Sequence, residues 1–438
     1  MQKLERVAFE KSVEAGVEIS APETARNYHP DAAAAVAHAR ALDFSPVSRG
    51  GEWGAHHSTV WFRIRGKLPA GWRGRKVVCR FDAGQRSGAD AREGFGAEGL
   101  FFLPESDPVA WTPQRNCTTV LKKARGGEFI EVWIEATANL CPDCLPRGHD
   151  SGTDEQQPLF QFNGACFISP EPAAEKAVAD FKAAWDAFGA LPQTGQLAAD
   201  LRAALLRVEA LPDQPDPFRR ISAILRPVMD RKNGGGAHRV FAAGHSHIDT
   251  AWLWPAGETI RKCARTFLTQ LNLLDSHPEH RFVISPALHL AWMRRHYPQI
   301  FDRIKKAVRA GRVDLPGMMW VESDCNLVSG ESLARQLLHG AGFYRENFGQ
   351  IPKGCWLPDS FGFPASLPRI LAAAGVRWFS TMKLSGNRRE RFPHTSFVWK
   401  GEDGSSVLVH LPPVSPRENF PGAEVLSGCE SRNMEKDR

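Results

Sequence analysis

The chain has 438 residues, enough for two or three domains, and its apolar and charged fractions of 42% and 24% are ordinary for a globular protein. Its formal net charge of +6 is small for this length and is spread along the chain, which argues against a nucleic-acid-binding surface. The charged start MQKLERVAFEKSVEAG lacks the apolar core of a signal peptide, and no run of about 18 apolar residues could span a membrane. We therefore expect a cytoplasmic protein.

Residues 1–165 are predicted to form a β-sandwich-like amino-terminal domain. Apolar residues recur at every second position over 60–65 and 130–135, the period of a half-buried strand, and 77–81 is a further candidate strand. Clusters of Gly, Pro and Asp separate these segments. Short strands so spaced favour a sandwich architecture.

Residues 166–236 are predicted to be a helical connector, because they are rich in Ala and Leu at helical spacing. The clearest stripe falls at i, i+3, i+4 and i+7 and consists of Leu201, Ala204, Leu205 and Val208. A further helix is expected over 221–230. The segment NGGGAH, residues 233–238, then reads as a flexible boundary.

Residues 237–415 alternate between strand-like and helical segments, which implies a parallel sheet, open or closed into a barrel. Strands are expected over 240–243, 282–284, 312–315, 354–357, 378–382 and 407–410. Helices are expected over 257–274, 287–310, 331–348 and 366–374. The fold class is thus α/β plus all-β. The last segment, 416–438, has no periodicity and is predicted to be a disordered tail.

The nine cysteines are odd in number and scattered, which suits free thiols in a reducing compartment. Only Cys141 and Cys144 form a CxxC pair, and a structural zinc site would need a second such pair. We interpret them as unpaired thiols in a loop.

The segment GHSHIDTAW, residues 244–252, carries the strongest functional signal. His245, His247 and Asp249 lie two residues apart and follow the apolar run 240–243. If that run is a strand, alternate side chains leave its carboxyl end toward one point. Imidazole and carboxylate ligands suit a divalent metal such as zinc. His245 could instead be a buried histidine bonded to the backbone.

Two later segments place further acids near strand ends. Asp359 in WLPDSFGFP follows an expected strand, which suits a catalytic or metal-binding carboxylate, or equally the N-cap of the next helix. Glu322 and Asp324 in WVESDCN share one face of an extended segment. They could bind sugar hydroxyls or transfer protons, or they could be solvated loop acids.

Four tryptophans lie near these acids in the sequence, namely Trp252, Trp254, Trp320 and Trp356. An aromatic face can pack against the apolar side of a pyranose ring. The competing interpretation, that these side chains fill the core, is the usual one for a tryptophan.

These motifs, in this order, resemble the α-mannosidases of glycoside hydrolase family 38, in the cytosolic and vacuolar branch that is also found in bacteria. The matching stretches run from about residue 240 to 413 and include GHSHIDTAWLWP, MWVESDCN, SGESLARQLL, WLPDSFGFPASLP and DGSSVLVHLPP. The β-rich first part looks like the amino-terminal domain of that branch.

The resemblance implies a seven-stranded β/α barrel with one zinc ion at the strand ends. By motif, His247 and Asp249 would be metal ligands, and Asp359 would be both a metal ligand and the nucleophile of a retaining mechanism. Trp252 would form the floor of the mannose pocket. Trp320, Glu322 and Asp324 are the other candidates for substrate binding, and the expected partner is a mannose-containing oligosaccharide.

The chain also departs from the family pattern. Family members are about twice as long or longer, and they take a fourth ligand, a histidine, and the acid/base residue from later segments. We therefore expect an incomplete barrel, a truncated product with little turnover alone, and a missing carboxy-terminal half or a homo-oligomer as possible partners. Two alternatives remain: a non-catalytic mannose-binding remnant, and a metal-dependent deacetylase or amidohydrolase, which the lack of a second HxH motif disfavours.

Overall fold

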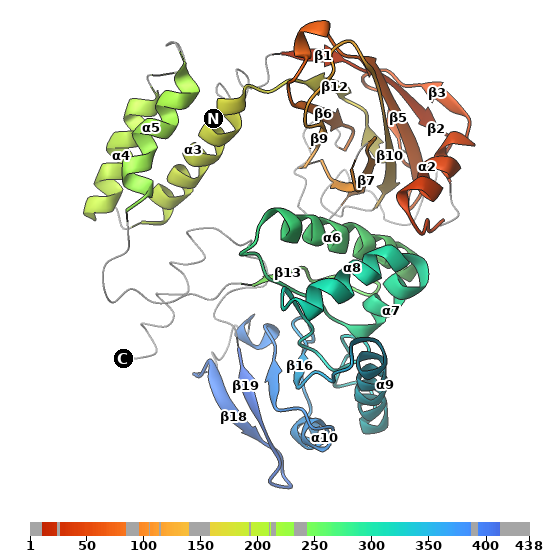
Figure 1. The fold of residues 1–438 in the computed structure, drawn as a ribbon. Helices are drawn as coiled ribbons and strands as arrows, with labels where there is room; N and C mark the ends of the chain where they lie inside the picture. The colour runs from red at the N-terminus through yellow and green to blue at the C-terminus, as the bar shows by residue number, and fades with distance from the viewer. Residues whose placement is uncertain are drawn as a thin grey trace, which may run out of the picture.

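The computed structural model describes residues 11–23, 27–84, 96–104, 106–113, 115–139, 158–191, 194–209, 211, 216–231, 243–386 and 393–411. Figure 1 shows an amino-terminal β-domain, a group of three helices and an α/β domain that follow one another along the chain. The predicted tail, the CxxC pair and the predicted boundary at 233–238 lie outside the described residues.

The amino-terminal domain consists of two antiparallel sheets around one apolar core. The larger sheet has the strand order β3-β2-β5-β10-β7-β8, the smaller has β1-β12-β6-β9, and β11 pairs with β4. The strands are β1 (Ser12–Glu14), β2 (Gly16–Ser20), β3 (Phe44–Pro46), β4 (Glu52–Trp53), β5 (Thr59–Lys67), β6 (Val77–Asp82), β7 (Ala97–Phe102), β8 (Val109–Trp111), β9 (Cys117–Leu121), β10 (Phe129–Ala138), β11 (Phe160–Gln161) and β12 (Gly164–Ile168). They are joined by the helix α2 (Ala32–Arg40) and the 3-10 turn η1 (Ala70–Trp72).

The predicted strands over 60–65, 77–81 and 130–135 are confirmed as parts of β5, β6 and β10. The prediction that the strands over 60–65 and 130–135 are buried on one face only was wrong, because β5 and β10 are buried on both faces. Trp61 and Trp133 point away from the sandwich core and are 1% and 3% exposed. Part of their cover comes from α2, where His38 contacts Trp61, and from β3, where Phe44 contacts Trp133. A strand's own periodicity cannot reveal such cover.

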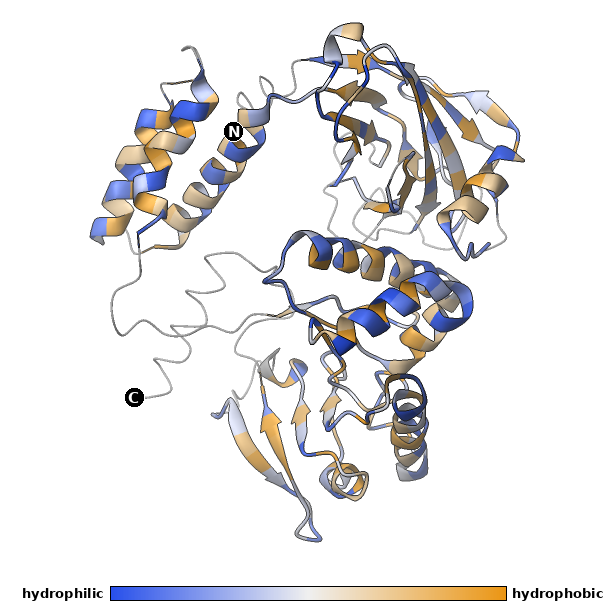
Figure 2. Cartoon of the chain, viewed as in Figure 1, coloured by the Kyte–Doolittle hydropathy of each residue, from blue (hydrophilic) through white to orange (hydrophobic). Residues whose placement is uncertain are grey.

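The connector forms three helices, α3 (Pro172–Ala190), α4 (Gln196–Glu209) and α5 (Pro217–Met229). The predicted stripe on α4 is confirmed, since Leu201, Ala204, Leu205 and Val208 are all buried in one cluster with α3 and α5. In Figure 2 these helices carry apolar and polar residues in stripes, as packing on one side requires.

The α/β domain contains two small sheets. In the first, β13 (Gly244–His245), β14 (Phe282–Val283) and β15 (Val313–Asp314) are parallel. In the second, β16 (Gly354–Trp356), β17 (Trp378–Ser380) and β19 (Ser406–His410) are parallel, and β18 (Ser396–Lys400) pairs antiparallel with β19. The helices are α6 (Ala256–Ser276), α7 (Ala287–His296), α8 (Pro298–Arg309), α9 (Gly330–Phe348), α10 (Leu367–Ala373) and the 3-10 turn η3 (Lys383–Gly386).

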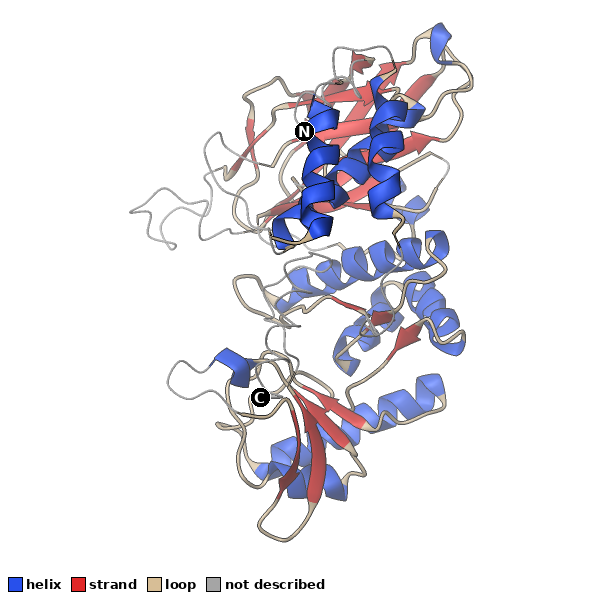
Figure 3. Ribbon diagram, turned by 90° about the vertical axis from the view of Figure 1, so that its left-hand side faces the viewer, coloured by secondary structure: helices blue, strands red, loops and turns tan. Residues whose placement is uncertain are grey.

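The two small sheets meet through the segment after β15, where the amide of Met318 donates to the carbonyl oxygen of Gly354 at 2.9 Å. Neither sheet closes on itself within the described residues. Figure 3 shows helices packed against both sheets. The alternation of strands and helices is therefore confirmed, while a seven-stranded barrel stays a prediction.

Two predicted elements need correction. The single helix expected over 287–310 is two helices, α7 and α8, because Pro298 cannot donate the amide that a continuous helix would need. Strand β18 was not predicted, although its half-buried Phe397 and Trp399 alternate with exposed residues, one of which is the apolar Val398.

Helix α6 lies between the two domains (Figure 1) and joins their apolar cores. A single cluster contains Trp61, Leu100 and Trp133 of the larger sheet together with Phe267 and Leu271 of α6. The amino-terminal domain and the α/β domain are thus packed as one body at this interface.

Within the described part of the chain, no helix combines the length and the apolar character that crossing a bilayer requires. The six cysteines found there are free thiols. The cytoplasmic location stays a prediction.

Candidate metal and sugar site

His247 and Asp249 follow β13 in the loop that leads to α6. Strand β13 pairs with β14, with His245 opposite Val283, so the chain leaves this sheet at its carboxyl edge. The apolar run that was predicted to be the strand, 240–243, lies outside the described residues except for Ala243. The strand is thus described only at its last two residues, directly before the loop.

Asp359 follows β16 on the second sheet. Gly354 permits this strand to lie close to β17, because a Cβ atom there would come within 2.1 Å of the Trp378 ring. The pairing continues past the strand, where the Leu357 amide donates to the Ser380 carbonyl at 3.0 Å. The next helix, α10, has Ser366 as its N-cap, so the alternative reading of Asp359 as a helix cap was wrong.

The structure brings the three predicted ligands together. One ligand atom from each of His247, Asp249 and Asp359 lies within 4.8 Å of the others. Asp359 is 110 residues from Asp249 along the chain and belongs to a different sheet, so the fold itself creates this convergence.

Glu322 connects the part of the cluster that follows β13 with the part that follows β16. Its Oε2 lies 2.6 Å from Nε2 of His247, and its Oε1 accepts a hydrogen bond from the backbone amide of Asp359. The Glu322 side chain is 18% exposed, which makes a bond to an imidazole stronger than it would be in open water. Glu322 therefore fixes the orientation of one candidate ligand and the backbone of another.

Lys383 is a member of the site that the motif analysis did not single out. Its Nζ lies 2.6 Å from Oδ1 of Asp359 and 4.8 Å from the centroid of the Phe361 ring. It follows β17, so a third strand end contributes to the cluster. The place of Lys383 in the sequence could have indicated this role. It follows a parallel strand, so it lies at the same edge of the sheet as Asp359.

The cluster is also coupled electrostatically. Burial tends to lower the pKa of His247, but the bond to Glu322 and the charges of Asp249 and Asp359 outweigh it and raise that pKa. Burial raises the pKa of Asp249, and the charges of Asp359 and Glu322 add to this against the opposing effect of His247. Several acids so close together attract a cation.

Two other histidines near the cluster are neutral. Burial, with a smaller effect of His247, lowers the pKa of His245 to about 4, and its ring packs edge-on to Trp356 at 5.4 Å. Burial also lowers the pKa of His289 to about 3, and its Nε2 lies 3.1 Å from Oγ1 of Thr250. Both rings lie against the loops that bear the ligands, and neither belongs to the three-residue cluster.

The predicted sugar-binding residues differ in their exposure and in their hydrogen-bond partners. Trp252 is 55% exposed and stands edge-on to Trp254, in the loop directly after Asp249. Asp324 uses Oδ1 to accept from the amides of Asn326 and Leu327 at 2.8 and 2.7 Å, which shapes a turn. Glu322 and Asp324 therefore serve different purposes, although they are two residues apart.

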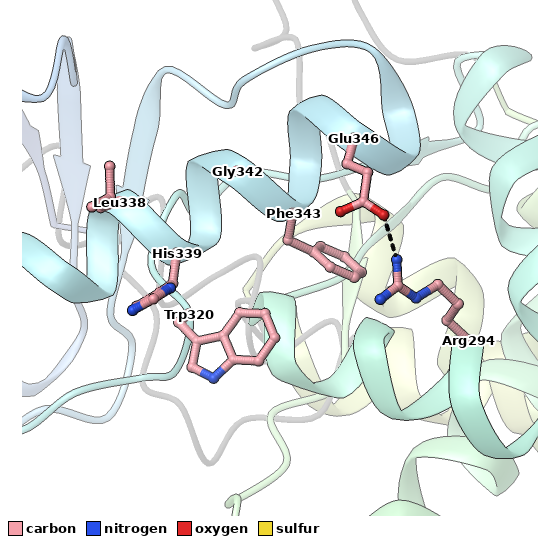
Figure 4. A pocket seen from close by; sticks show the side chains of 7 residues that line it. All are labelled: Arg294, Trp320, Leu338, His339, Gly342, Phe343 and Glu346. Atoms are coloured by element: carbon pink, nitrogen blue, oxygen red, sulfur yellow. Dashed lines mark hydrogen bonds and ion pairs between the residues drawn. The ribbon is translucent and has the colours of Figure 1, made fainter.

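Trp320 lines a groove between α7 and α9 that is separate from the ligand cluster. The groove has a volume of about 570 Å³ and is lined by Arg294, Trp320, Leu338, His339, Gly342, Phe343 and Glu346 (Figure 4). None of these seven residues is one of the candidate ligands. The role of Trp320 in sugar binding stays a prediction.

One imidazole and two carboxylates form a donor set that fits a zinc ion, with water or substrate completing a tetrahedron. Asp359 retains a second carboxylate oxygen for such an ion beside its contact with Lys383. The site thus has the chemistry of a mononuclear metal centre at the strand ends of an α/β domain, which is typical of hydrolases of this architecture.

Comparisons with known proteins agree with this class. Residues 237–436 match the glycosyl hydrolases family 38 N-terminal domain, and residues 18–165 match the alpha-mannosidase jelly roll domain. Both larger domains of the chain therefore belong to the α-mannosidases of glycoside hydrolase family 38.

Curated relatives support the same family. Alpha-mannosidase 2C1 of Homo sapiens is 34% identical over 90% of this chain, and Alpha-mannosidase of Saccharomyces cerevisiae is 30% identical over 85%. The chain spans only 37% and 35% of these two proteins. A solved α-mannosidase from Enterococcus faecalis V583 is 22% identical over 39% of this chain and 19% of its own, with a TM-score of 0.33.

Proposed function

We propose that the chain provides the zinc- and mannose-binding site of a retaining α-mannosidase that acts on α-linked mannose in oligosaccharides. The observation that carries this proposal is the meeting of His247, Asp249 and Asp359, whose ligand atoms lie within 4.8 Å of one another. The relatives bearing the name α-mannosidase support the choice of sugar.

In this proposal each residue of the site has a separate role. His247, Asp249 and Asp359 would hold the ion, and Asp359 is also the nucleophile. Glu322 keeps His247 and the backbone of Asp359 in place through its two carboxylate oxygens. Trp252, which is exposed and follows Asp249 by three residues, offers an aromatic face to the sugar ring.

The first step of the proposed reaction is the attack of an Asp359 oxygen on the anomeric carbon of mannose. The bond to the leaving oxygen breaks; an aryl leaving group departs as the aryloxide, whereas the oxygen of an oligosaccharide must take a proton from a general acid. Water then attacks the anomeric carbon, loses a proton and releases the Asp359 carboxylate, so two displacements retain the configuration at that carbon. When bound, zinc would hold the 2- and 3-hydroxyls of mannose and stabilise the oxocarbenium-like charge. The ammonium group of Lys383 pairs with Oδ1 of Asp359 and so helps to fix the position of that carboxylate before the attack.

The experiment is to incubate the purified chain and zinc with an activated aryl α-mannoside whose leaving group needs no protonation. We expect mass spectrometry to find one mannosyl group on Asp359. The label should fall to background when zinc is chelated and in Asp359→Asn. The same aryl group on β-mannose is the control and should not label the protein.

Labelling of another residue, or labelling that survives chelation, would contradict the proposal. Zinc-dependent binding of mannose without any labelling would instead select the non-catalytic, mannose-binding alternative.

A further inference from the structure

The amino half of α6 has an unusual composition for a buried helix surface. Glu258, Thr259, Arg261, Lys262 and Arg265 are all at most 6% exposed. A buried charge is costly unless it is paired, so each of these side chains needs partners. The three bases among them take acid partners from the amino-terminal jelly roll.

Three acids and three bases form this buried network. Lys262 Nζ and Arg265 Nε both donate to Glu98 of β7, the latter at 3.0 Å, and Arg261 donates to Glu135 of β10. Arg265 also donates to Glu258 within α6. The six charges cancel, which permits their joint burial.

Asn139, which follows β10, makes a second hydrogen-bonded connection between the two domains. Its Nδ2 donates to Oε1 of Glu98 at 2.9 Å and to Oε1 of Glu258 at 3.0 Å. Since Asn139 is 1% exposed, both bonds are shielded from water. The amino half of α6 is therefore held at a fixed position on the larger sheet.

The same half-helix contacts the loop that bears Asp249. Lys262 Nζ lies 4.2 Å from the centroid of the Trp254 ring, and Trp254 Nε1 donates to Oγ1 of Thr259 at 3.0 Å. Thr259 Oγ1 in turn donates to the carbonyl oxygen of Thr250 at 2.7 Å, and it lies 3.4 Å from that of Asp249. An unbroken series of contacts thus runs from Glu98 to the backbone of Asp249.

We propose that the jelly roll positions the metal-binding loop, with Glu98 and Asn139 as positioning residues that act on Asp249 through Lys262, Trp254 and Thr259. The consequence for metal affinity rests on the proposed function, whereas the bracing of the loop does not. The jelly roll is by this account part of the scaffold of the site, since residues of two domains are needed to hold one ligand.

The test compares Glu98→Gln with Glu18→Gln in the full chain. Glu18 is the matched control, because it pairs with Arg63 and Arg65 inside the jelly roll and its side chain is 20% exposed, against 16% for Glu98. Hydrogen exchange of the peptide over 244–254 is measured without metal. We expect exchange about tenfold faster in Glu98→Gln and unchanged in Glu18→Gln.

A second pair of variants tests the hydroxyl that makes the last contact. Thr259→Val removes it at nearly constant shape and should speed exchange of the loop, whereas Thr259→Ser should restore the wild-type rate. Equal loop exchange in Glu98→Gln, Glu18→Gln and the wild type would overturn the proposal, as would Thr259→Ser behaving like Thr259→Val.

Zinc titration of the same proteins separates this proposal from the proposed function. We expect Glu98→Gln to bind zinc about tenfold more weakly and Glu18→Gln to match the wild type. If the wild type binds no zinc, the proposed function fails, and the exchange data still decide whether the jelly roll braces the loop.

Discussion

Glu322 is the residue on which the geometry of the site depends most, after the ligands themselves. It is bonded to Nε2 of His247 and to the amide of Asp359, so one carboxylate orients groups from two sheets. Groups that orient metal ligands typically change metal affinity by about 10- to 100-fold when they are removed.

We therefore predict that Glu322→Gln weakens zinc binding by about tenfold or more, because the neutral amide cannot provide the same charge-assisted bond to His247. Competition with a zinc-chelating dye measures the change. The control is Glu331→Gln, which alters an exposed acid that pairs with Arg335 of the same helix, α9. Wild-type affinity in Glu322→Gln would contradict the prediction.

Some of the individual residues of the site could be predicted from the sequence. The resemblance to glycoside hydrolase family 38 singled out His247, Asp249 and Asp359 as ligands, whereas their positions after strands left His245 and an N-cap role for Asp359 open. The bonds made by Glu322 and Lys383 could not be predicted, because their partners lie in loops without periodicity. The different environments of Glu322 and Asp324 are likewise set by turn geometry.

Helix α9 shows how one element positions another. Gly340 faces the segment after β15, where a Cβ atom would come within 1.8 Å of the carbonyl oxygen of Met318. Gly342, two residues away on the same helix, has no neighbour within 4 Å of such an atom. The helix therefore lies close to the chain that joins the two small sheets because a glycine permits it.

This contrast gives a prediction for two matched variants. Gly340→Ala should destabilise the protein by about 2 kcal/mol or more, since a backbone atom must move to admit the methyl group. Gly342→Ala should be neutral, or stabilising by up to about 1 kcal/mol, because alanine favours the helix. Urea unfolding measures both, and equal effects of the two substitutions would contradict the packing described here.

The elements themselves were predicted best where periodicity acts within one segment, as in α4, β5 and β10. The predictions failed where a distant segment or a single proline decides the outcome. Trp61 and Trp133 are buried because other elements, among them α2 and β3, cover the outer face of the sheet. The helix expected over 287–310 breaks at Pro298. The periodicity within one segment shows neither which elements cover the outer face of a sheet nor whether a barrel closes.

At the scale of the whole molecule, the buried ionic network makes the stability of the protein sensitive to acid. Burial raises the pKa of Glu258, but the charges of Arg265, Arg261 and Lys262 outweigh it and lower the pKa to about 2. In the unfolded chain this carboxyl has its ordinary pKa of 4.5. Its contribution to stability is therefore complete above that value and is lost as the pH falls toward 2.

We predict that the urea midpoint falls between about pH 5 and pH 2, and that Glu258→Gln flattens this part of the curve although it lowers stability at neutral pH. The groups that face Glu258 are Arg261, Lys262 and Arg265 on its own helix and Asn139 from the jelly roll. Parallel curves for variant and wild type would contradict this assignment.

The central claim is that three side chains from two sheets meet around one cation. The most direct measurement is a crystal structure of the chain grown with zinc, with the ion located by its anomalous scattering. We predict one strong peak at about 2.0–2.2 Å from a nitrogen of His247 and from an oxygen of both Asp249 and Asp359. A structure with zinc bound elsewhere, or with Asp359 paired to Lys383 and out of reach of the other two ligands, would contradict the account.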